Sequence, residues 1–447
     1  IWPRDWSSDV CSSDLETGER MKVLNPGERS VLVQYVQLAL NRAGYDIRKD
    51  GILGENTCRA LRQFLRKKSG EEFNCKIDDV VWGKLFPYLK GYTMHEIKSG
   101  DTLWGIAANY DTSVSAIMTA NPTVNPLALR TGSILAIPFS FSLVAEDVAY
   151  TSYLNDWILE GLTVRYPFLV QGNIGKSAMG KEIPYLRIGT GEREVFYSGA
   201  YHANEWITTP VLLKFAEEYA HAFAAGRMLY TVQTAWLFYG FSLYLVPMVN
   251  PDGVDLVNGV LEEGASLEEA ERIAADYPKI PFPNGWKANI EGIDLNLQFP
   301  AGWENARNIK FAMGFTTPAP RDYVGEAPLV APESRSVYEF TRAHNFSLIL
   351  AYHAQGEVIY WRYLDYEPAD SRRIAEYFGE VSGYRVEETP SASGYAGFKD
   401  WFIQEYNRPG YTIEVGMGVS PLPMSQFAGI YEDNRLILEG GMTELVR

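Results

Sequence analysis

The sequence predicts an α/β domain over residues 148–447, a three-helix module over residues 21–91 and a small strand–helix–helix–strand module over residues 92–140. In the long C-terminal part, apolar strand-like segments alternate with amphipathic helices, as in a sheet covered by helices on both faces. In the first module, apolar residues recur at helical spacing. The length of 447 residues agrees with about three domains at roughly 150 residues each.

Residues 1–20 are set aside from this scheme. Residues 5–15, DWSSDVCSSDL, read as the translation of a sequencing-library adapter, so we expect residues 1–20 to combine this artefact with a leader. Such an artefact would hide any signal peptide. With Cys11 removed, Cys58 and Cys75 remain, and their spacing allows either a disulfide or two free thiols.

Composition excludes two classes of partner. The net charge of −16 argues against non-specific binding to nucleic acid. Spanning a bilayer takes about 20 consecutive apolar residues, and the sequence contains no uncharged run of that length. We therefore expect neither a nucleic-acid partner nor a membrane partner.

The first module contains three helical segments. SVLVQYVQLALNRAGY closes on Gly44, a suitable C-cap, and the next helix follows a turn at Asp50-Gly51 and begins at Asn56 or Thr57. IDDVVWGKLFPYL gives the third helix. This pattern resembles the three-helix peptidoglycan-binding domain, which implies a role in binding the cell wall. An unrelated three-helix bundle is the alternative.

Residues 92–140 contain a short strand, the helix opened by SGDTLWGIAANY, a second helix and the returning strand LRTGSILAIP. Asp101 precedes the first apolar helical positions and is expected to cap that helix. The segment resembles a LysM module. The resemblance implies binding of N-acetylglucosamine-containing glycans between the loops at residues 100–103 and 121–123. Such a module would direct the protein to bacterial peptidoglycan.

The third domain carries a candidate metal site. His202 and Glu205 directly follow the apolar strand VFYSGA, and His353 ends the apolar strand SLILAY. Ligand sites in open α/β sheets lie at the carboxyl ends of strands, and two histidines with one carboxylate leave a zinc ion one open position. Glu414 lies inside the apolar segment GYTIEVG, where burial would raise the pKa of its carboxyl group toward that of a general base.

These residues lie in a longer set of segments: YHANEWITTPVLLKF, VPMVNPDGV, GIDLNLQFP, APES, LILAYHAQG and GYTIEVG. Their order is similar to that of the zinc carboxypeptidase (carboxypeptidase A-like) family over about 300 residues. The resemblance implies a mixed sheet covered by helices and one zinc ion held by His202, Glu205 and His353. It also implies that Glu414 is the general base that activates water.

Two positions depart from the digestive members of that family. An Asn-Arg pair there grips the substrate's terminal carboxylate, whereas Asn296 is followed here by Leu297, which cannot replace a guanidinium. Lys287 takes the place of the arginine that stabilises the carbonyl oxyanion. The substrate-side tyrosine of the family corresponds to Tyr395 or to Tyr384.

Residues 261–287 form a large insertion before these positions. We expect it to wall the substrate subsite and to contribute Trp286 or Lys287 to recognition of a diamino acid or of a D-glutamate carboxylate. A solvated helix and loop would give the same pattern.

A carboxypeptidase-like domain without the arginine clamp, fused to wall-binding modules, looks like the bacterial γ-D-glutamyl-L-diamino acid endopeptidases. This resemblance implies hydrolysis of the bond between γ-D-glutamate and diaminopimelate in peptidoglycan stem peptides. It also implies a location outside the cell, in the cell wall or in the developing spore. The alternatives are a stem-peptide carboxypeptidase that uses another cation and a wall-binding protein without activity.

Overall fold

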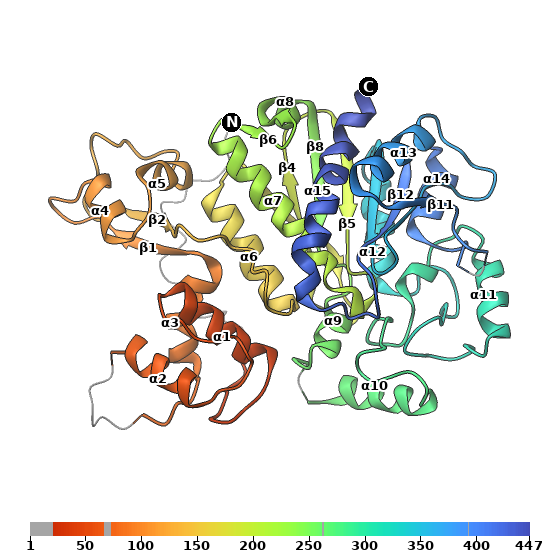
Figure 1. Cartoon of the computed structure of the whole chain (residues 1–447), viewed down its shortest axis with the longest axis horizontal. Coiled ribbons are helices and arrows are strands. Elements are labelled where there is room, and N and C mark those ends of the chain that lie inside the picture. Colours follow the sequence, from red (N-terminus) through yellow and green to blue (C-terminus); the bar gives the residue numbers. More distant parts are fainter. Residues whose placement is uncertain (1–20, 67–72, 262, 392) are drawn as a thin grey trace. The chain divides into compact units, whose positions relative to one another are not determined.

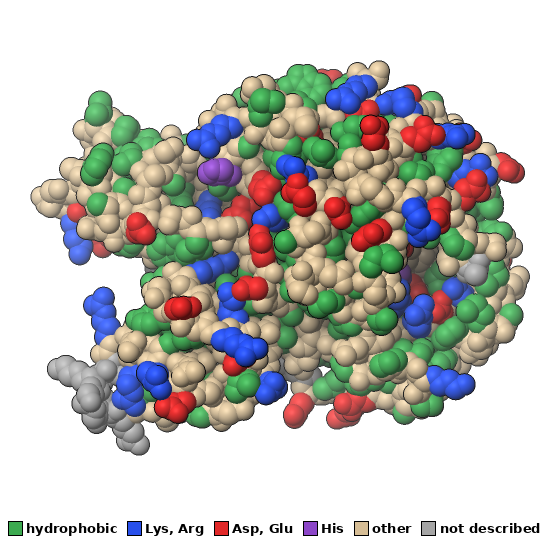
Figure 2. All heavy atoms as spheres, in the orientation of Figure 1, with side chains coloured by type: hydrophobic (Ala, Val, Ile, Leu, Met, Phe, Trp, Pro, Cys, Tyr) green, Lys and Arg blue, Asp and Glu red, His purple; other side chains and the backbone are tan. Residues whose placement is uncertain are grey.

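The computed structural model describes residues 21–66, 73–261, 263–391 and 393–447, so the expected artefact lies outside the described residues. The chain forms two units, one ending at Leu143 and the other covering Val144–Arg447 (Figure 1). Among the described residues, no helix combines the length and the apolar character needed to cross a bilayer. On the face in Figure 2, acidic and basic side chains are interspersed.

The first module consists of three helices: α1 (Val31–Arg42), α2 (Glu55–Phe64) and α3 (Asp79–Lys90). The predicted start of α2 at Asn56 or Thr57 is wrong by one or two residues, because Gly54 is the N-cap. Thr57 instead contacts the first helix: its hydroxyl accepts a hydrogen bond from Gln37 Nε2 at 3.0 Å. The same Gln37 amide donates to Asp50 Oδ1 at 2.8 Å and so fixes the Asp50-Gly51 turn.

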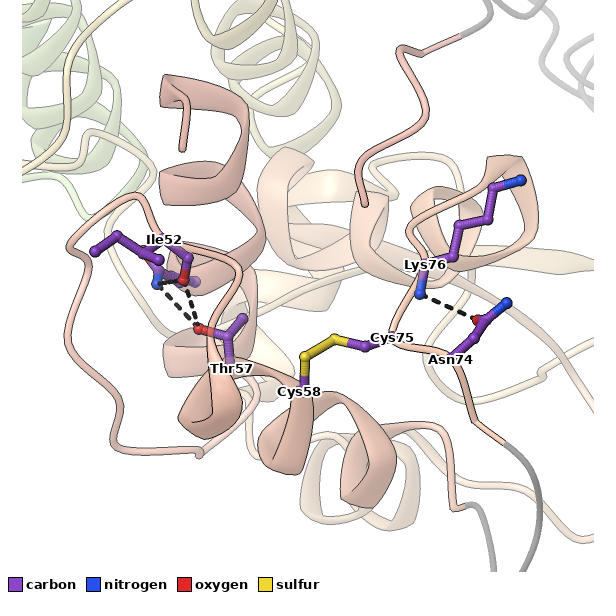
Figure 3. The surroundings of a disulfide bond; sticks show 7 residues. Ile52, Thr57, Cys58, Asn74, Cys75 and Lys76 are labelled. Carbon is purple, nitrogen blue, oxygen red and sulfur yellow. Dashed lines mark hydrogen bonds between the residues drawn. A yellow bond between two sulfur atoms is a disulfide. The ribbon is translucent and has the colours of Figure 1, made fainter. Parts of the chain in front are cut away.

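A disulfide joins Cys58 of α2 to Cys75, with 5.4 Å between their Cα atoms (Figure 3). The sequence had left this pairing open. Disulfides persist in oxidising surroundings such as the exterior of the cell. The bond therefore agrees with the expected location outside the cytoplasm.

The second module is a two-stranded sheet with two helices, formed by β1 (Tyr92–Glu96), α4 (Leu103–Asn109), α5 (Val114–Ala120) and β2 (Ile134–Pro138). The prediction that Asp101 caps α4 is wrong. Thr102 is the N-cap, and its hydroxyl accepts from Gly105 N at 3.0 Å. Asp101 accepts from Lys98 N at 2.7 Å and contacts His95 Nε2 at 2.9 Å, so it stabilises the turn before the helix.

The second unit is built on an eight-stranded mixed sheet in the order β11-β10-β12-β9-β5-β8-β4-β3. Its central strands run parallel, while β10 joins β12, and β4 joins β8, in the antiparallel sense. The strands are β3 (Val170–Lys176), β4 (Glu182–Ile188), β5 (Arg193–Ser198), β8 (Phe241–Val246), β9 (Leu348–His353), β10 (Val358–Tyr360), β11 (Arg385–Glu387) and β12 (Gly410–Glu414). A separate small hairpin pairs β6 (Met228–Leu229) with β7 (Val232–Gln233). The predicted mixed sheet is confirmed.

Helices cover both faces of this sheet (Figure 1). On one face, Tyr197 donates to the Leu438 carbonyl of α15 at 2.9 Å. On the other face, the ring of Phe196 packs against those of Phe340 in α12 and Phe398 in α14. The helices are α6 (Ser152–Arg165), α7 (Thr208–Ala224), α8 (Thr234–Gly240), α9 (Pro251–Val257), α10 (Ala265–Asp276), α11 (Trp303–Ala312), α12 (Pro332–Arg342), α13 (Ser371–Ser382), α14 (Phe398–Tyr406) and α15 (Phe427–Thr443).

Candidate active site

The carboxyl ends of three neighbouring parallel strands carry the predicted site residues. His202 follows β5 at the start of the short 3-10 helix Ala203–Glu205, His353 is the last residue of β9, and Glu414 is the last residue of β12. Strand β9 lies between β5 and β12, and Glu414 lies opposite His353 in the ladder. Paired residues of adjacent strands point to the same face of a sheet, so both side chains point toward α14.

Three of the predicted residues meet at one point. His202 Nδ1 lies 3.0 Å from Glu205 Oε1, and His353 Nδ1 lies 3.1 Å from Glu205 Oε2. The two Nδ1 atoms are 3.3 Å apart. Ligand atoms from all three residues lie within 4.8 Å of one another, as in a compact metal site.

The donor atoms of this cluster fit a zinc ion. Asp294 Oδ1 lies 3.1 Å from His202 Nε2 and accepts its proton, which leaves a lone pair on Nδ1 in the neutral imidazole. That lone pair faces the Glu205 carboxylate and the second Nδ1, an arrangement that a shared cation stabilises. Two imidazole nitrogens and one carboxylate are the ligand set of catalytic zinc sites, and the carboxylate behind the first histidine is their usual outer partner.

The charges around the cluster also favour a cation. Burial lowers the pKa of His202, but the Glu205 and Asp294 carboxylates outweigh it and raise this pKa to about 9. Burial raises the pKa of Glu205, whereas His202 and Lys287 together lower it well below its ordinary value. A position where carboxylates hold a proton so firmly attracts any cation that can replace it.

Lys287 and Glu414 flank the cluster. Lys287 Nζ lies 2.6 Å from Glu205 Oε1, and the backbone of Lys287 is tied to the 3-10 helix because Ala203 N donates to its carbonyl at 3.0 Å. Burial, and then the Glu205 carboxylate, raise the pKa of Glu414 to about 8. A carboxyl group with such a pKa exchanges protons readily near neutral pH, as a general base must.

The site opens into a cleft of about 190 Å³ lined by residues from several loops, β12 and α14. Asn296 and Leu297 line this cleft, and their role as substrate contacts stays a prediction. Tyr395 does not: its ring packs against Tyr363 and the apolar cluster around Leu297. The loop before α14 presents other residues, such as Ser393, to the cleft, and a substrate contact by Tyr395 stays a prediction.

Two further expectations are corrected. Tyr384 lies away from the cleft, where its hydroxyl accepts a hydrogen bond from Asn434 Nδ2 at 2.9 Å. Trp286 is fully buried, and its indole nitrogen donates to the Asn289 carbonyl at 3.0 Å, so it supports the Lys287 segment and does not face the substrate. Among the described residues of the insertion (261 and 263–287), only Lys287 lines the cleft.

The sequence had not singled out Asp294, which orients His202. A usable signal was present, since a metal-binding histidine commonly gives its second N–H to a carboxylate and Asp294 lies two residues before Asn296. Five other charged residues of the lining had no signal of their own. They are Lys310, Arg321, Asp322, Lys399 and Asp400.

Comparison with known proteins agrees with this geometry. The sequence model of the zinc carboxypeptidase family matches residues 156–437, more than half of the chain. The chain belongs to the zinc carboxypeptidase family. A LysM family model matches residues 95–138, which confirms the predicted second module.

Two bacterial proteins are similar over about two thirds of the chain. The chain is 44% identical to gamma-D-glutamyl-L-diamino acid endopeptidase 1 of Lysinibacillus sphaericus over 299 residues, 66% of this chain and 72% of the relative. It is 43% identical to the uncharacterized protein YqgT of Bacillus subtilis over 306 residues, 68% of this chain and 79% of the relative. Among solved structures, thrombin activatable fibrinolysis inhibitor matches with a TM-score of 0.53 and 16% identity, covering 74% of this chain and 96% of that chain. This last likeness shows the fold alone.

Proposed function

We propose that this protein is a zinc metallopeptidase that hydrolyses peptidoglycan stem peptides at the bond between γ-D-glutamate and the diamino acid. Family membership supports zinc-dependent peptide hydrolysis, and the relative from Lysinibacillus sphaericus, which is named for cleavage at γ-D-glutamyl-L-diamino acid bonds, supports the choice of bond. The LysM module supports the choice of peptidoglycan as the polymer that is bound.

One observation carries the choice of an endopeptidase. Leu297 lies beside Asn296 in the cleft lining and packs with Trp303 and Val324 in an apolar cluster. An apolar side chain there forms no charged hydrogen bond with a terminal carboxylate. A substrate that continues beyond the first residue after the cut therefore loses no contact at this position.

In the proposed mechanism, His202, Glu205 and His353 hold one zinc ion. When bound, zinc polarises the scissile carbonyl and lowers the pKa of water. Glu414 removes a proton from the attacking water and delivers it to the nitrogen of the leaving amine, while the water oxygen forms the new carboxylate. The Lys287 ammonium lies beside Glu205 and stabilises the negative charge that develops on the carbonyl oxygen.

The N-terminal modules act as anchors in this proposal. The three-helix module binds peptidoglycan alongside the LysM module, and both raise the local concentration of the catalytic domain on an insoluble substrate. The protein acts outside the cell, in the cell wall. Association with the spore wall is the more specific form of this location, and imaging of a fluorescent fusion in sporulating cells tests it.

The decisive experiment is mass spectrometry of muropeptides digested by the protein. We expect the stem peptide to be cut after γ-D-glutamate, so that a peptide beginning with the diamino acid is released. Release of one C-terminal amino acid alone would instead identify a carboxypeptidase.

That carboxypeptidase is the second candidate function, and one observation favours it. Arg321 lines the cleft with a side chain that is 43% exposed, although Asp322 already accepts from its Nε at 2.6 Å. A guanidinium in this position would bind a terminal carboxylate in place of the missing clamp. Amidating the C-terminus of a tripeptide stem separates the candidates, because amidation abolishes cleavage only if such a clamp operates.

A further inference from the structure

A second groove lies at the opposite end of the sheet from the metal cluster. It has a volume of about 780 Å³, and its lining includes the loop at residues 190–193, α8, Asn345 and Ser347. Strands β5, β8 and β9 begin at this end, whereas His202 and His353 lie where β5 and β9 end. In Figure 1, α8 and α9 mark the two ends of β8. The proposed mechanism uses none of the residues that line this α8 groove.

Two large aromatic residues of the α8 groove are exposed. Trp236 is 46% exposed and Tyr239 is 68% exposed. They are three residues apart on α8 and so lie on the same side of the helix. Leu237 and Phe238 of the same helix are buried and attach it to the core. Packing of α8 therefore does not require the two exposed rings, and neighbouring exposed apolar groups mark interaction sites.

Neighbouring rings hold both exposed side chains in position. The ring of Trp236 meets that of Phe241 edge to face, with 5.7 Å between the centroids, and the ring of Tyr239 meets that of Phe238 in the same way at 5.4 Å. Aromatic pairs prefer this arrangement. A ligand loses less affinity to ordering when the side chains that bind it are already ordered. The α8 groove therefore presents two pre-ordered rings.

The backbone that forms the groove is also fixed. Thr190 N donates to the Phe238 carbonyl at 2.8 Å, and Gly191 N donates to the Phe241 carbonyl at 3.0 Å. A Cβ at Gly191 would lie 2.1 Å from the carbonyl carbon of Gly240, so only glycine allows this close approach of the loop to the end of α8. These contacts hold the loop and the helix together as one wall.

The other functional groups of the groove are polar and carry no excess charge. Among the described residues, the lining contains one acidic and one basic side chain, Glu192 and Arg193, beside the uncharged Thr190, Asn345 and Ser347. Polyanions such as nucleic acids bind surfaces rich in lysine and arginine, and this lining is not of that kind. A sugar ring packs the apolar C–H groups of its face on aromatic rings, and its hydroxyl and amide groups pair with polar side chains. The groove therefore matches a neutral glycan.

We propose that the α8 groove binds the N-acetylated glycan strand of peptidoglycan, with Trp236 and Tyr239 each packed against a sugar ring. This inference deepens the proposed function, from which it takes the polymer. A glycan in the groove leaves the cleft free for a stem peptide, because the two lie at opposite ends of the sheet. The catalytic domain then binds the insoluble substrate itself, in addition to the LysM module, and two linked sites bind more tightly than either alone.

The test measures binding of the full chain to immobilised glycan strands from which stem peptides and other wall polymers have been removed. Trp236→Ala/Tyr239→Ala should bind at least about fivefold more weakly, because two aromatic contacts are lost. Trp236→Phe/Tyr239→Phe keeps both aromatic faces and should retain most of the affinity. Tyr366→Ala removes a ring that is 42% exposed elsewhere in the second unit, and this matched control should bind as the wild type does. Hydrolysis of a soluble stem peptide should be equal in all these proteins, which shows that each is folded.

Hydrogen–deuterium exchange locates the ligand. Adding an N-acetylglucosamine hexamer should slow amide exchange in α8 (Thr234–Gly240) of the wild type and not of the double alanine variant, while the LysM segment at residues 95–138 responds in both. The affinity difference between these proteins should also persist from about 0.05 to about 0.5 M salt, since contacts of uncharged groups are not screened. A difference that vanishes at high salt would assign the groove to a polyanion and overturn the inference.

Equal binding by the wild type and the double alanine variant, or unchanged exchange in α8, would refute the assignment. A shift of the double variant to a smaller oligomer in analytical ultracentrifugation would assign the groove to a second copy of this chain and refute it as well. These readouts do not depend on which bond is cut. If muropeptide digestion shows a different cut while the variant loses glycan binding, the proposed bond is wrong and the groove is a glycan site. The expected cut with unchanged glycan binding would refute the groove alone.

Discussion

Replacing Asp294 by asparagine tests how the metal cluster is oriented. Asp294 Oδ1 accepts from His202 Nε2 at 3.1 Å and from Asn296 N at 3.2 Å, while Oδ2 accepts from Asp322 N at 3.1 Å. All three partners are donors. In Asp294→Asn, one of the two oxygens becomes an NH₂ group that faces a donor, either on His202 or on Asp322.

The expected cost falls on zinc affinity. If the NH₂ group faces His202, the imidazole must move its proton to Nδ1, the atom that faces Glu205, or rotate away. Loss of such an outer partner typically costs 10–100-fold in metal affinity or activity, which corresponds to about 1.4–2.7 kcal/mol. We therefore expect zinc to bind at least about tenfold more weakly, with the fold retained.

The assay is competition for zinc with a chromophoric chelator, together with circular dichroism to follow the fold. Glu194→Gln is a matched control, because Glu194 Oε1 contacts His344 Nδ1 at 3.0 Å and Oε2 accepts from Asn345 N at 2.8 Å, outside the metal cluster. That control should leave zinc affinity unchanged. An Asp294→Asn protein that binds zinc as tightly as the control would refute the proposed orientation of His202.

Three further outcomes are expected. Glu414→Gln should bind zinc normally and lose about 10²–10⁴-fold in turnover, and near-normal turnover would exclude Glu414 as the base. Because the pKa of His202 is about 9 and its proton must leave when zinc binds, zinc affinity should rise about tenfold per pH unit between about pH 6 and 8, and a flat profile would contradict this. Burial raises the pKa of Glu333 to about 7, so the stability this group contributes is present below its unfolded pKa and is lost as pH rises through about 7. Glu333→Gln should flatten that decline in a melting-temperature series, and an unchanged decline would assign it to another group.

The sequence predicted those parts of the site that lie at strand ends. His202, His353 and Glu414 each follow or end an apolar strand, and the carboxyl ends of adjacent parallel strands converge by geometry. Local pattern was therefore enough to bring these three residues together. The same reasoning identified the central strands and the helices between them.

The sequence pattern could not predict which residues on loops and at helix starts would reach the cleft. Lys399 and Asp400 occupy the first turn of α14, where charged residues are common on solvent-exposed surfaces, and only the packing of α14 against the sheet brings them to the cleft. For Trp286 the error was the reverse: the sequence suggested a residue in the cleft, and the structure buries it. Its position in the insertion beside Lys287 suggested a substrate contact, but its side chain is fully buried.

Several side chains around Leu297, and not Leu297 alone, bear on whether this domain can act as a carboxypeptidase. Leu297 is only 7% exposed and packs with Trp303, Ala306 and Val324. An arginine placed there would direct a guanidinium into this apolar cluster, and burying an unpaired charge costs several kcal/mol. The surrounding residues are therefore matched to leucine. Conversion to a carboxylate clamp would require rebuilding the cluster as well as the residue, so the apolar subsite is a property of the local core of this domain.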